Sequence, residues 1–334
     1  MHPVFDVLKK DERDQLRSRT DQRFESPMLA TLTHDFFSDS NWIYERKLDG
    51  ERCIAKNDGL PVKLLSRNHK DVTVSYPEVR DALSRQEAPS FLVDGEIVAF
   101  EDNVSSFSAL QGRMHVKDED EARQTGIRVF YYLFDVLYVD GYDVMQIALR
   151  SRKSLLRKLF TYESPLRYTQ HRNEDGVAYY HEACAKGWEG IIAKDARSAY
   201  VQTRSRKWLK FKCVHQQEFV IGGYTDPGGE RTGFGALLIG YYNDDELRYA
   251  GKVGTGFDEE LLATLSSTLS SLERSRSPFS DEIDERGVHW VEPTLVAEVG
   301  FTEWTSHGKL RHPRFLGVRR DKPAHDVIRE EGAP

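Results

Sequence analysis

The sequence has few of the residues that build secreted scaffolds and metal-binding modules. Its 334 residues include only three cysteines: Cys53, Cys184 and Cys213. They are far apart, and no CxxC pair or Cys/His quartet accompanies them. An odd number of widely spaced cysteines predicts reduced, partly buried thiols rather than a disulfide framework or a zinc site.

Long apolar runs are also missing. The N-terminus, MHPVFDVLKKDERDQLRSRTD, is charged throughout and lacks the apolar stretch of a secretory signal. The most apolar stretch, VFYYLFDVLYV, is about half as long as a membrane span requires and carries Asp135. We therefore expect a cytoplasmic protein without a membrane segment. The length predicts two domains.

Positive charge is scarce overall but locally concentrated. The net charge of −7 argues against a protein that coats nucleic acid non-specifically. Residues 194–212, however, hold seven basic residues against one acidic residue, and residues 309–322 hold six against one. Such stretches predict a defined site for a polyanion. A pair of solvated basic faces is the alternative, and composition alone leaves both open.

The pattern of residue types in the sequence changes near residues 213–218. Before this point, strand-like runs rich in β-branched and aromatic residues alternate with helical patterns over residues 76–86, 150–160 and 174–187. After it, short strands broken by Gly, Pro and Asp surround one helix with a leucine stripe. The pattern predicts an α+β chain with a mixed domain over residues 1–215 and a small OB-type β-barrel over residues 216–334.

Two strand-like segments place lysines where an anion would suit them. In YERKLDGERC, Lys47 stands two residues before an Asp-Gly turn; taken alone, it is a solvated lysine of a β-hairpin. In WLKFK, Lys210 and Lys212 share one strand face about 7 Å apart and repel each other. A phosphate between them would relieve the repulsion, and a solvated outer face is the alternative.

Carboxylates mark two other apolar strands. Asp94 and Glu96 share one face of VDGEIVAF, and Glu189 begins EGIIAK. Carboxylates at the ends of buried strands are costly unless a cation or a metal compensates them. Ion pairs with the lysines would satisfy them, and so would Mg²⁺, which takes few protein carboxylates and completes its shell with water and phosphate oxygens.

Together these segments resemble those of the covalent nucleotidyltransferases, the superfamily of ATP-dependent DNA ligases, RNA ligases and capping enzymes. The matching motifs, in order, are KxDGxR (residues 47–52), SRN (66–68), DGE (94–96), LFDVL (133–137), EGIIAK (189–194) and WLKFK (208–212). The ending FTEWTSHGKLRHPRFLGVRRDK resembles the end of the OB domain in bacterial ATP-dependent DNA ligases, including the ligase module of end-joining enzymes. The resemblance implies a nucleotidyltransferase (adenylation) domain of antiparallel sheets with flanking helices, followed by an OB-fold β-barrel.

The resemblance implies that Lys47 is the nucleophile. It would attack the α-phosphate of ATP, form a phosphoramidate and release pyrophosphate. A free lysine amine has a pKa of about 10.4 and is a poor nucleophile at neutral pH. Its pKa must therefore fall, and Lys210, Lys212 and a divalent cation, Mg²⁺ or Mn²⁺, would lower it.

The resemblance also implies roles for the other motif residues. The nucleotide would be held by Glu45 at the adenine edge, Phe134 stacked on the base, and Arg52 and Glu96 at the ribose and phosphates. Glu189 would lie near the metal, with Glu96 as a second candidate ligand, and Lys210 and Lys212 would contact the α-phosphate. Arg67 would lie close to the 5′-phosphate of the nick, and the leaving pyrophosphate would be oriented by Arg319, Asp321 and Lys322.

The leading hypothesis is a DNA-repair enzyme that seals 3′-OH/5′-phosphate nicks in duplex DNA with ATP, and we expect a monomer. An RNA ligase or a capping-type nucleotidyltransferase is the alternative enzyme, and a non-catalytic nucleic-acid-binding module is the alternative of another class. The short chain without a zinc-finger cysteine set disfavours an NAD-dependent ligase. His69 and Lys70 follow SRN where end-joining ligases usually have Gly, and YVQTRSRKW stands where they carry Pro-Gly. Both departures leave the substrate preference open.

Overall fold

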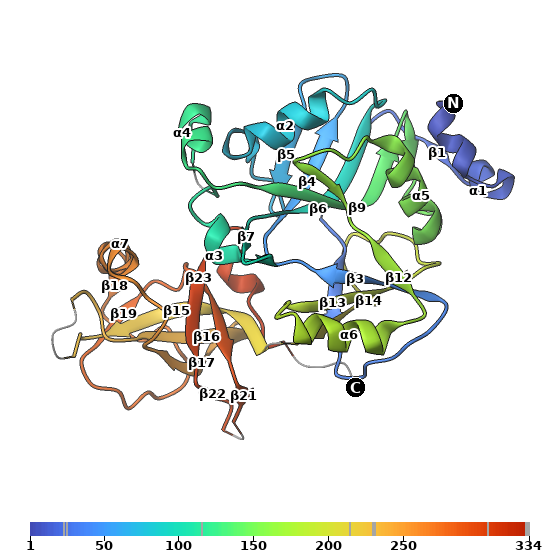
Figure 1. The fold of residues 1–334 in the computed structure, drawn as a ribbon. Helices are drawn as coiled ribbons and strands as arrows, with labels where there is room; N and C mark the ends of the chain where they lie inside the picture. The colour runs from blue at the N-terminus through green and yellow to red at the C-terminus, as the bar shows by residue number, and fades with distance from the viewer. Residues whose placement is uncertain are drawn as a thin grey trace. The chain divides into compact units, whose positions relative to one another are not determined.

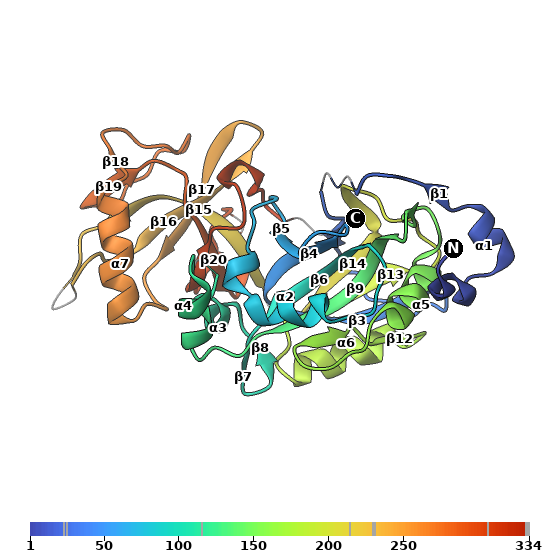
Figure 2. The ribbon, with the colours of Figure 1, turned by 90° about the horizontal axis from the view of Figure 1, so that it is seen from above.

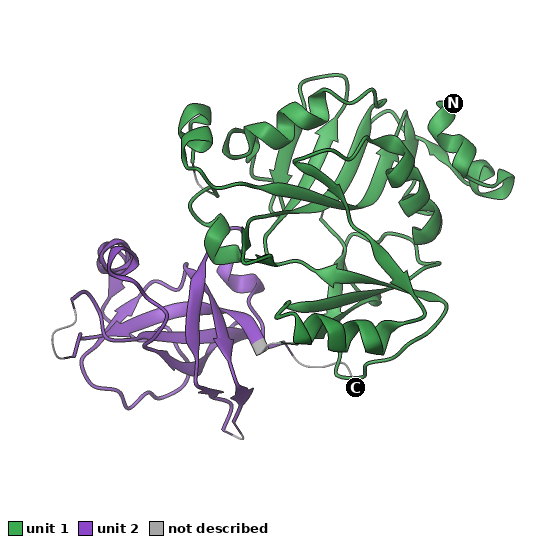
Figure 3. Ribbon diagram, viewed as in Figure 1, with its two compact units in different colours: residues 1–213, 332–334 green, residues 214–331 purple. Residues whose placement is uncertain are grey.

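The structure is a computed structural model that describes residues 1–22, 24, 26–114, 116–213, 215–228, 232–305 and 307–330. The described chain separates into two compact units (Figure 3). The first unit extends to Cys213, and the second begins with the described residues at His215.

Two sheets form the frame of the first unit. In one, the strands are ordered β1 (Arg17–Ser18), β10 (Tyr142–Asp143), β9 (Phe130–Val139), β6 (Phe91–Val98), β4 (Glu51–Asn57) and β5 (Lys63–Ser66), and β11 (Leu166–Tyr168) pairs with β9. In the other, the order is β12 (His171–Asn173), β3 (Trp42–Lys47), β13 (Gly190–Asp195), β14 (Arg204–Lys212) and β2 (Leu29–Leu32). Pairing is antiparallel in both except at β11–β9 and β14–β2. A hairpin of β7 (Phe100–Glu101) and β8 (Val104–Ser105) is separate.

Helices cover the outer face of each sheet (Figures 1 and 2). Helices α2 (Pro77–Ser84) and α5 (Leu149–Leu159) bury their apolar sides against the first sheet, and α6 (Gly176–Ala185) buries Tyr179 and Ala183 against the second. Pro77 suits the first turn of α2, where its missing N–H costs nothing. Among the described residues, no helix has both the length and the apolar character of a membrane-spanning segment.

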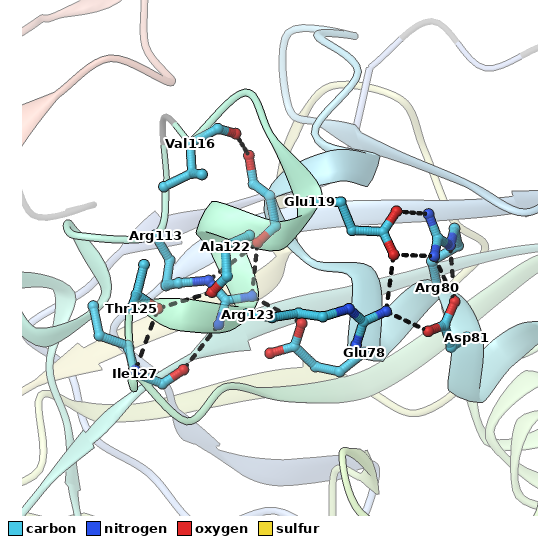
Figure 4. A network of polar contacts seen from close by, with 11 residues as sticks. Glu78, Arg80, Asp81, Arg113, Val116, Glu119, Ala122, Arg123, Thr125 and Ile127 are labelled. Carbon is cyan, nitrogen blue, oxygen red and sulfur yellow. Dashed lines mark hydrogen bonds and ion pairs between the residues drawn. The ribbon is translucent and has the colours of Figure 1, made fainter.

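The remaining helical segments of the first unit are short: η1 (Pro3–Val7), α1 (Lys10–Asp14), η2 (Thr73–Ser75), α3 (Phe107–Leu110) and α4 (Glu119–Gln124). A network of charged side chains ties α4 to α2 (Figure 4). Arg80 of α2 binds Glu119 at 2.7 Å, and Arg123 of α4 binds Asp81 at 2.7 Å. Each such pair contributes little on its own because it is partly exposed, but together the pairs hold the short helix in one place.

An apolar core lies between the two sheets of the first unit. It joins Ile54 and Phe134 of the first sheet to Trp208 of the second. Because side chains alternate along a strand, the neighbours of these residues at two-residue spacing also face the space between the sheets. This arrangement decides which side chains can form a common site.

The second unit is built on β15 (His215–Thr225). Its sheet is ordered β17 (Glu246–Val253), β16 (Leu237–Asn243), β15, β19 (Val288–Val291) and β18 (Glu273–Arg274), while β20 (Val296–Phe301) pairs with both β15 and β23 (Arg314–Arg319). The other elements are α7 (Glu259–Ser270), β21 (Glu303–Trp304), β22 (Leu310–Arg311) and η3 (Ala324–Asp326). The unit is consistent with the expected OB type, although the strand pairs of its described residues leave the barrel open.

The expectation of three reduced cysteines is wrong. Cys184, near the end of α6, forms a disulfide with Cys213, which follows β14, and their Cα atoms lie 5.1 Å apart. Cys53 is free and buried. Sequence spacing concealed the pair because it forms only when α6 packs on the second sheet, where the Tyr180 hydroxyl donates to the Lys212 carbonyl at 3.2 Å.

Candidate active site

Most of the residues expected to act in the first unit face the space between its two sheets. Glu45 and Lys47 lie two residues apart on β3, and Arg52 and Phe134 come from the opposite sheet. Contact across that space is direct, since the Lys194 ammonium lies 4.3 Å from the centre of the Phe134 ring. The strand alternation therefore brings together residues that are far apart in the sequence.

Lys47 forms an ion pair with Glu189. Strand register explains the meeting, because Gly190 of β13 lies opposite Lys47 on one side and opposite Lys212 on the other. A side chain at position 190 would not fit, since its Cβ would lie 2.0 Å from the Phe211 carbonyl oxygen. Glycine after Glu189 thus allows the three strands to pack closely at the end where the lysines meet.

The ion pair decides the charge state of Lys47. Burial works to lower the pKa of its amine, but the Glu189 carboxylate outweighs this effect and holds the pKa above its usual value. Lys212 works in the expected, lowering direction. In this state of the protein Lys47 is an ammonium, so the expected fall of its pKa does not arise from the neighbouring lysines alone.

Arg52 is held by a carboxylate of its own sheet. It forms two hydrogen bonds with Asp94, at 2.5 and 2.6 Å, and Tyr200 donates its hydroxyl to the same carboxylate at 2.7 Å. The guanidinium lies 4.6 Å from the centre of the Phe134 ring. Burial works against the charge of Arg52, yet Asp94 raises the pKa above its usual value. Glu96 lies directly opposite Arg52 in the strand register.

Glu45 is buried among cations that the sequence did not connect with it. Lys153 of α5 contacts one carboxylate oxygen, and Lys194 of β13 lies 2.6 Å from the other. Burial alone would raise the pKa of Glu45, but the two lysines hold it below its usual value. Lys153 escaped the sequence analysis because it sits in a basic helix, where it has no distinguishing signal.

Arg67 follows β5 and belongs to the tight turn that closes with a hydrogen bond from the Ser66 N–H to the Lys70 carbonyl. His69 in this turn has a φ of 59°, in the left-handed region that glycine adopts most easily. This conformation suits the glycine that the resemblance led us to expect after SRN. The structure describes the turn but leaves the role of Arg67 at the nick a prediction.

The three residues expected to orient pyrophosphate belong to the second unit. Arg319 binds Asp321 at 2.7 Å and Glu298 at 3.1 Å, and Lys322 binds Glu218 at 3.1 Å. Within the unit these charges are paired and largely buried. Their meeting with Lys47 stays a prediction.

The described residues offer few protein ligands for a divalent cation. No group of three or more His, Cys, Asp or Glu side chains suited to a metal occurs among the described residues. Mg²⁺ commonly uses one or two protein carboxylates and takes its other ligands from water and phosphates. Glu189 and Glu96 are carboxylates of the kind that would hold such an ion, and the donor chemistry therefore fits a metal that arrives with a nucleotide.

Comparison with known proteins identifies related families. The family described as "ATP dependent DNA ligase domain" matches residues 27–212, and "ATP dependent DNA ligase C terminal region" matches residues 230–322. The multifunctional non-homologous end joining protein LigD of Pseudomonas aeruginosa is 39% identical over 317 residues, which cover 92% of this chain and 37% of the relative. The LigD protein of Mycobacterium tuberculosis is 38% identical over 331 residues, covering 95% of this chain and 42% of the relative.

One solved structure matches this chain over its own full length. The structure described as mycobacterial DNA ligase D complexed with ATP and MES has a TM-score of 0.65 and 34% identity, and the match covers 92% of this chain and 100% of that one. By contrast, the present chain spans well under half the length of the two LigD relatives. Both family matches and the solved structure agree in one assignment: the chain belongs to the ATP-dependent DNA ligase family.

Proposed function

We propose that this chain seals 3′-OH/5′-phosphate nicks in duplex DNA through an adenylate on Lys47. The observation that carries the proposal is the convergence of Lys47, Glu189 and Lys212 around Gly190. It supports Lys47 as the nucleophile, with a carboxylate and a second cation beside it. The LigD relatives are named for non-homologous end joining, and we extend that repair role to this chain.

The inner faces of the two sheets would bind ATP. Phe134 offers a ring for the base, and Arg52 supplies a fixed positive charge near the ribose and phosphates. Lys210 and Lys212 would neutralise the α-phosphate, where negative charge grows during transfer. A bound Mg²⁺ or Mn²⁺, held by Glu189 with Glu96 as a second candidate, would neutralise further phosphate charge.

Lys47 must pass a proton to water, to which its side chain is partly exposed, before its amine can attack phosphorus. The ion pair with Glu189 keeps that proton on the lysine and fixes where the amine lies. The side chain of Lys47 is 20% exposed, so an arriving nucleotide can reach it. Attack then forms the P–N bond and releases pyrophosphate. The adenylate passes to the 5′-phosphate of the nick, and the 3′-OH displaces AMP.

The proposal includes a monomer that meets ATP and DNA in the cytoplasm. A disulfide is unusual there, so the redox state of Cys184 and Cys213 bears on the compartment. Arg319, Asp321 and Lys322 would act only while pyrophosphate leaves, which is the first of the three steps.

The test is labelling with ATP followed by sealing of a defined nick. Intact mass spectrometry after incubation with ATP and Mg²⁺ should show one AMP, removable by acid, on the wild type and on Lys63→Ala, an exposed lysine of β5. Lys47→Ala should carry none. An adduct on Lys47→Ala would overturn the nucleophile assignment, and an adenylated wild type that joins nicked RNA but not nicked DNA would favour the RNA-ligase alternative.

A further inference from the structure

The strongest unexplained feature is the buried cluster around Glu45. Lys153, Lys194 and Glu45 are each no more than 3% exposed at the side chain, and together they carry two positive charges against one negative charge. A buried surplus of positive charge is energetically costly unless another group compensates it. The neighbouring Arg152 does not share it, because that residue is neutralised by its own bonds to Asp135.

Unpartnered polar atoms border the same cluster. Among the described residues, buried side-chain atoms without a hydrogen-bond partner include Thr169 Oγ1, His171 Nδ1 and Trp208 Nε1. The Thr169 carbonyl accepts from Lys153 at 3.0 Å, and the Trp208 ring lies 3.9 Å from the Lys194 ammonium. Buried donors and acceptors almost always have partners. These atoms therefore indicate a site that is completed by water or by a ligand.

The cluster lies on the strand face that carries the nucleophile. Glu45 and Lys47 are two residues apart on β3, so their side chains point to the same side, about 7 Å apart along the strand. In a nucleotide whose α-phosphorus lies against Lys47, the ribose separates the base from that phosphorus, so the base lies farther from Lys47. The Phe134 ring, which Lys194 contacts, faces the same space between the sheets. The position of the cluster thus corresponds to that of the base.

The chemistry of the carboxylate selects among bases. A carboxylate offers about four lone-pair sites, and the two lysines use one on each oxygen. An ionised carboxylate accepts a hydrogen bond from the amino group of adenine but repels the carbonyl oxygen that guanine carries at the same place. If Glu45 became protonated, it would donate to that carbonyl and lose the selection. The cations that keep it ionised therefore matter as much as Glu45 itself.

We propose that Lys153 is a positioning residue for nucleotide choice: it holds Glu45 ionised and oriented so that the site takes an adenine and rejects a guanine. The proposal rests on the nucleotidyl-transfer function proposed above. Lys153 is well placed for this role because Arg152, its neighbour on α5, anchors the helix by donating to the carbonyls of Ile147 and Ser198 at 2.6 and 3.0 Å. Lys153 acts on the nucleotide through Glu45.

The primary test separates binding from chemistry. In a Lys47→Ala background nucleotides bind without reacting, and thermal shifts with ATP and with GTP give the two affinities. Adding Lys153→Met should reduce the preference for ATP over GTP at least about tenfold, and Lys153→Arg should restore part of it. Lys158→Met, on the exposed side of the same helix, is the matched control and should leave the preference unchanged.

Kinetics supply the second readout. With Lys47 present, Lys153→Met should raise the KM for ATP in self-adenylation more than it lowers kcat, and it should also raise the KM for a nick that already carries 5′-AMP, because that nick brings the same adenine to the site. A wild type that neither accepts AMP nor seals such a nick would defeat the proposed function instead, so the two failures are distinguishable.

Two results would overturn the role of Lys153. The first is an equal loss of affinity for ATP and GTP in Lys153→Met with their ratio unchanged, because a purely structural lysine would behave in this way. The second concerns folding. If Lys153→Met does not fold, Lys153→Gln replaces it as the neutral variant, and failure of both to fold while Lys153→Arg folds normally would assign the lysine to the core alone.

Discussion

Removal of the Cys184–Cys213 disulfide should lower the stability of the first unit by a calculable amount. The bond joins two cysteines with a sequence separation of 29, and the chain-entropy model then gives a contribution of about 3.6 kcal/mol at 25 °C. The first unit has the size for which each kcal/mol changes the melting temperature by about 2–4 °C. Reduction should therefore lower Tm by roughly 7–14 °C.

The assay is calorimetry of the oxidised protein with and without dithiothreitol, joined to thiol counting in denaturant. Denatured oxidised protein should show one thiol, that of Cys53, and reduced protein three. Cys184→Ser, Cys213→Ser and the double variant should each lose about the same stability, because one substitution already removes the whole cross-link. Reductant should have no further effect on any of them.

The reasoning would be refuted by three free thiols in protein purified without reductant, or by additive losses in the two single variants. Additivity would mean that each cysteine stabilises the unit through its own packing. The enclosed loop contains Glu189, Lys210 and Lys212, so the same samples show whether the cross-link also matters for self-adenylation.

Three further predictions concern single side chains. Burial and the charge of Lys153 lower the pKa of His171 to about 4, so its contribution to stability is present above pH 6.5 and disappears as the pH falls towards 4. Urea unfolding should therefore show that the free energy of unfolding is lower at pH 4 than at pH 7 by about 1–2 kcal/mol, after discounting for the partial exposure of the ring, and His171→Asn should lack this loss. Asp94→Asn leaves the Arg52 guanidinium without its counter-charge and should cost about 3–5 kcal/mol by the same measurement, whereas a loss below 1 kcal/mol would show that solvent already screens the pair. His69→Gly should preserve stability or raise it by up to about 1 kcal/mol in thermal unfolding, because glycine adopts the φ of 59° without strain.

Local patterns were sufficient for several of the elements. The alternation in residues 42–47 and 208–212 predicts strands, and the structure has β3 and β14 there. The same alternation places Lys210 and Lys212 on one face. Family resemblance then supplied the fold class, since six ordered motifs specify an arrangement that no single motif could.

Features that depend on distant packing could not be predicted in this way. The Cys184–Cys213 bond requires α6 to lie on the second sheet, and nothing near either cysteine encodes that contact. Lys153 is one of several basic residues in its helix, and only the depth at which α5 packs distinguishes it from Lys158. The partner of Asp94 was equally hidden, because it lies on the neighbouring strand.

Two lysine–carboxylate pairs in the site are alike in composition but serve opposite needs. In the proposed reaction the pair of Lys47 and Glu189 has to separate before the amine attacks, and the Lys47 side chain is 20% exposed. In the proposed selection of the base the pair of Lys153 and Glu45 has to persist while nucleotides bind and leave, and both side chains are 2% exposed. Removing one partner of a fully buried pair costs about 3–5 kcal/mol, and the Lys47–Glu189 pair, with the lysine 20% and the carboxylate 6% exposed, is less deeply buried than the Lys153–Glu45 pair. Depth of burial therefore decides which pair can take part in chemistry and which can hold the geometry of base selection.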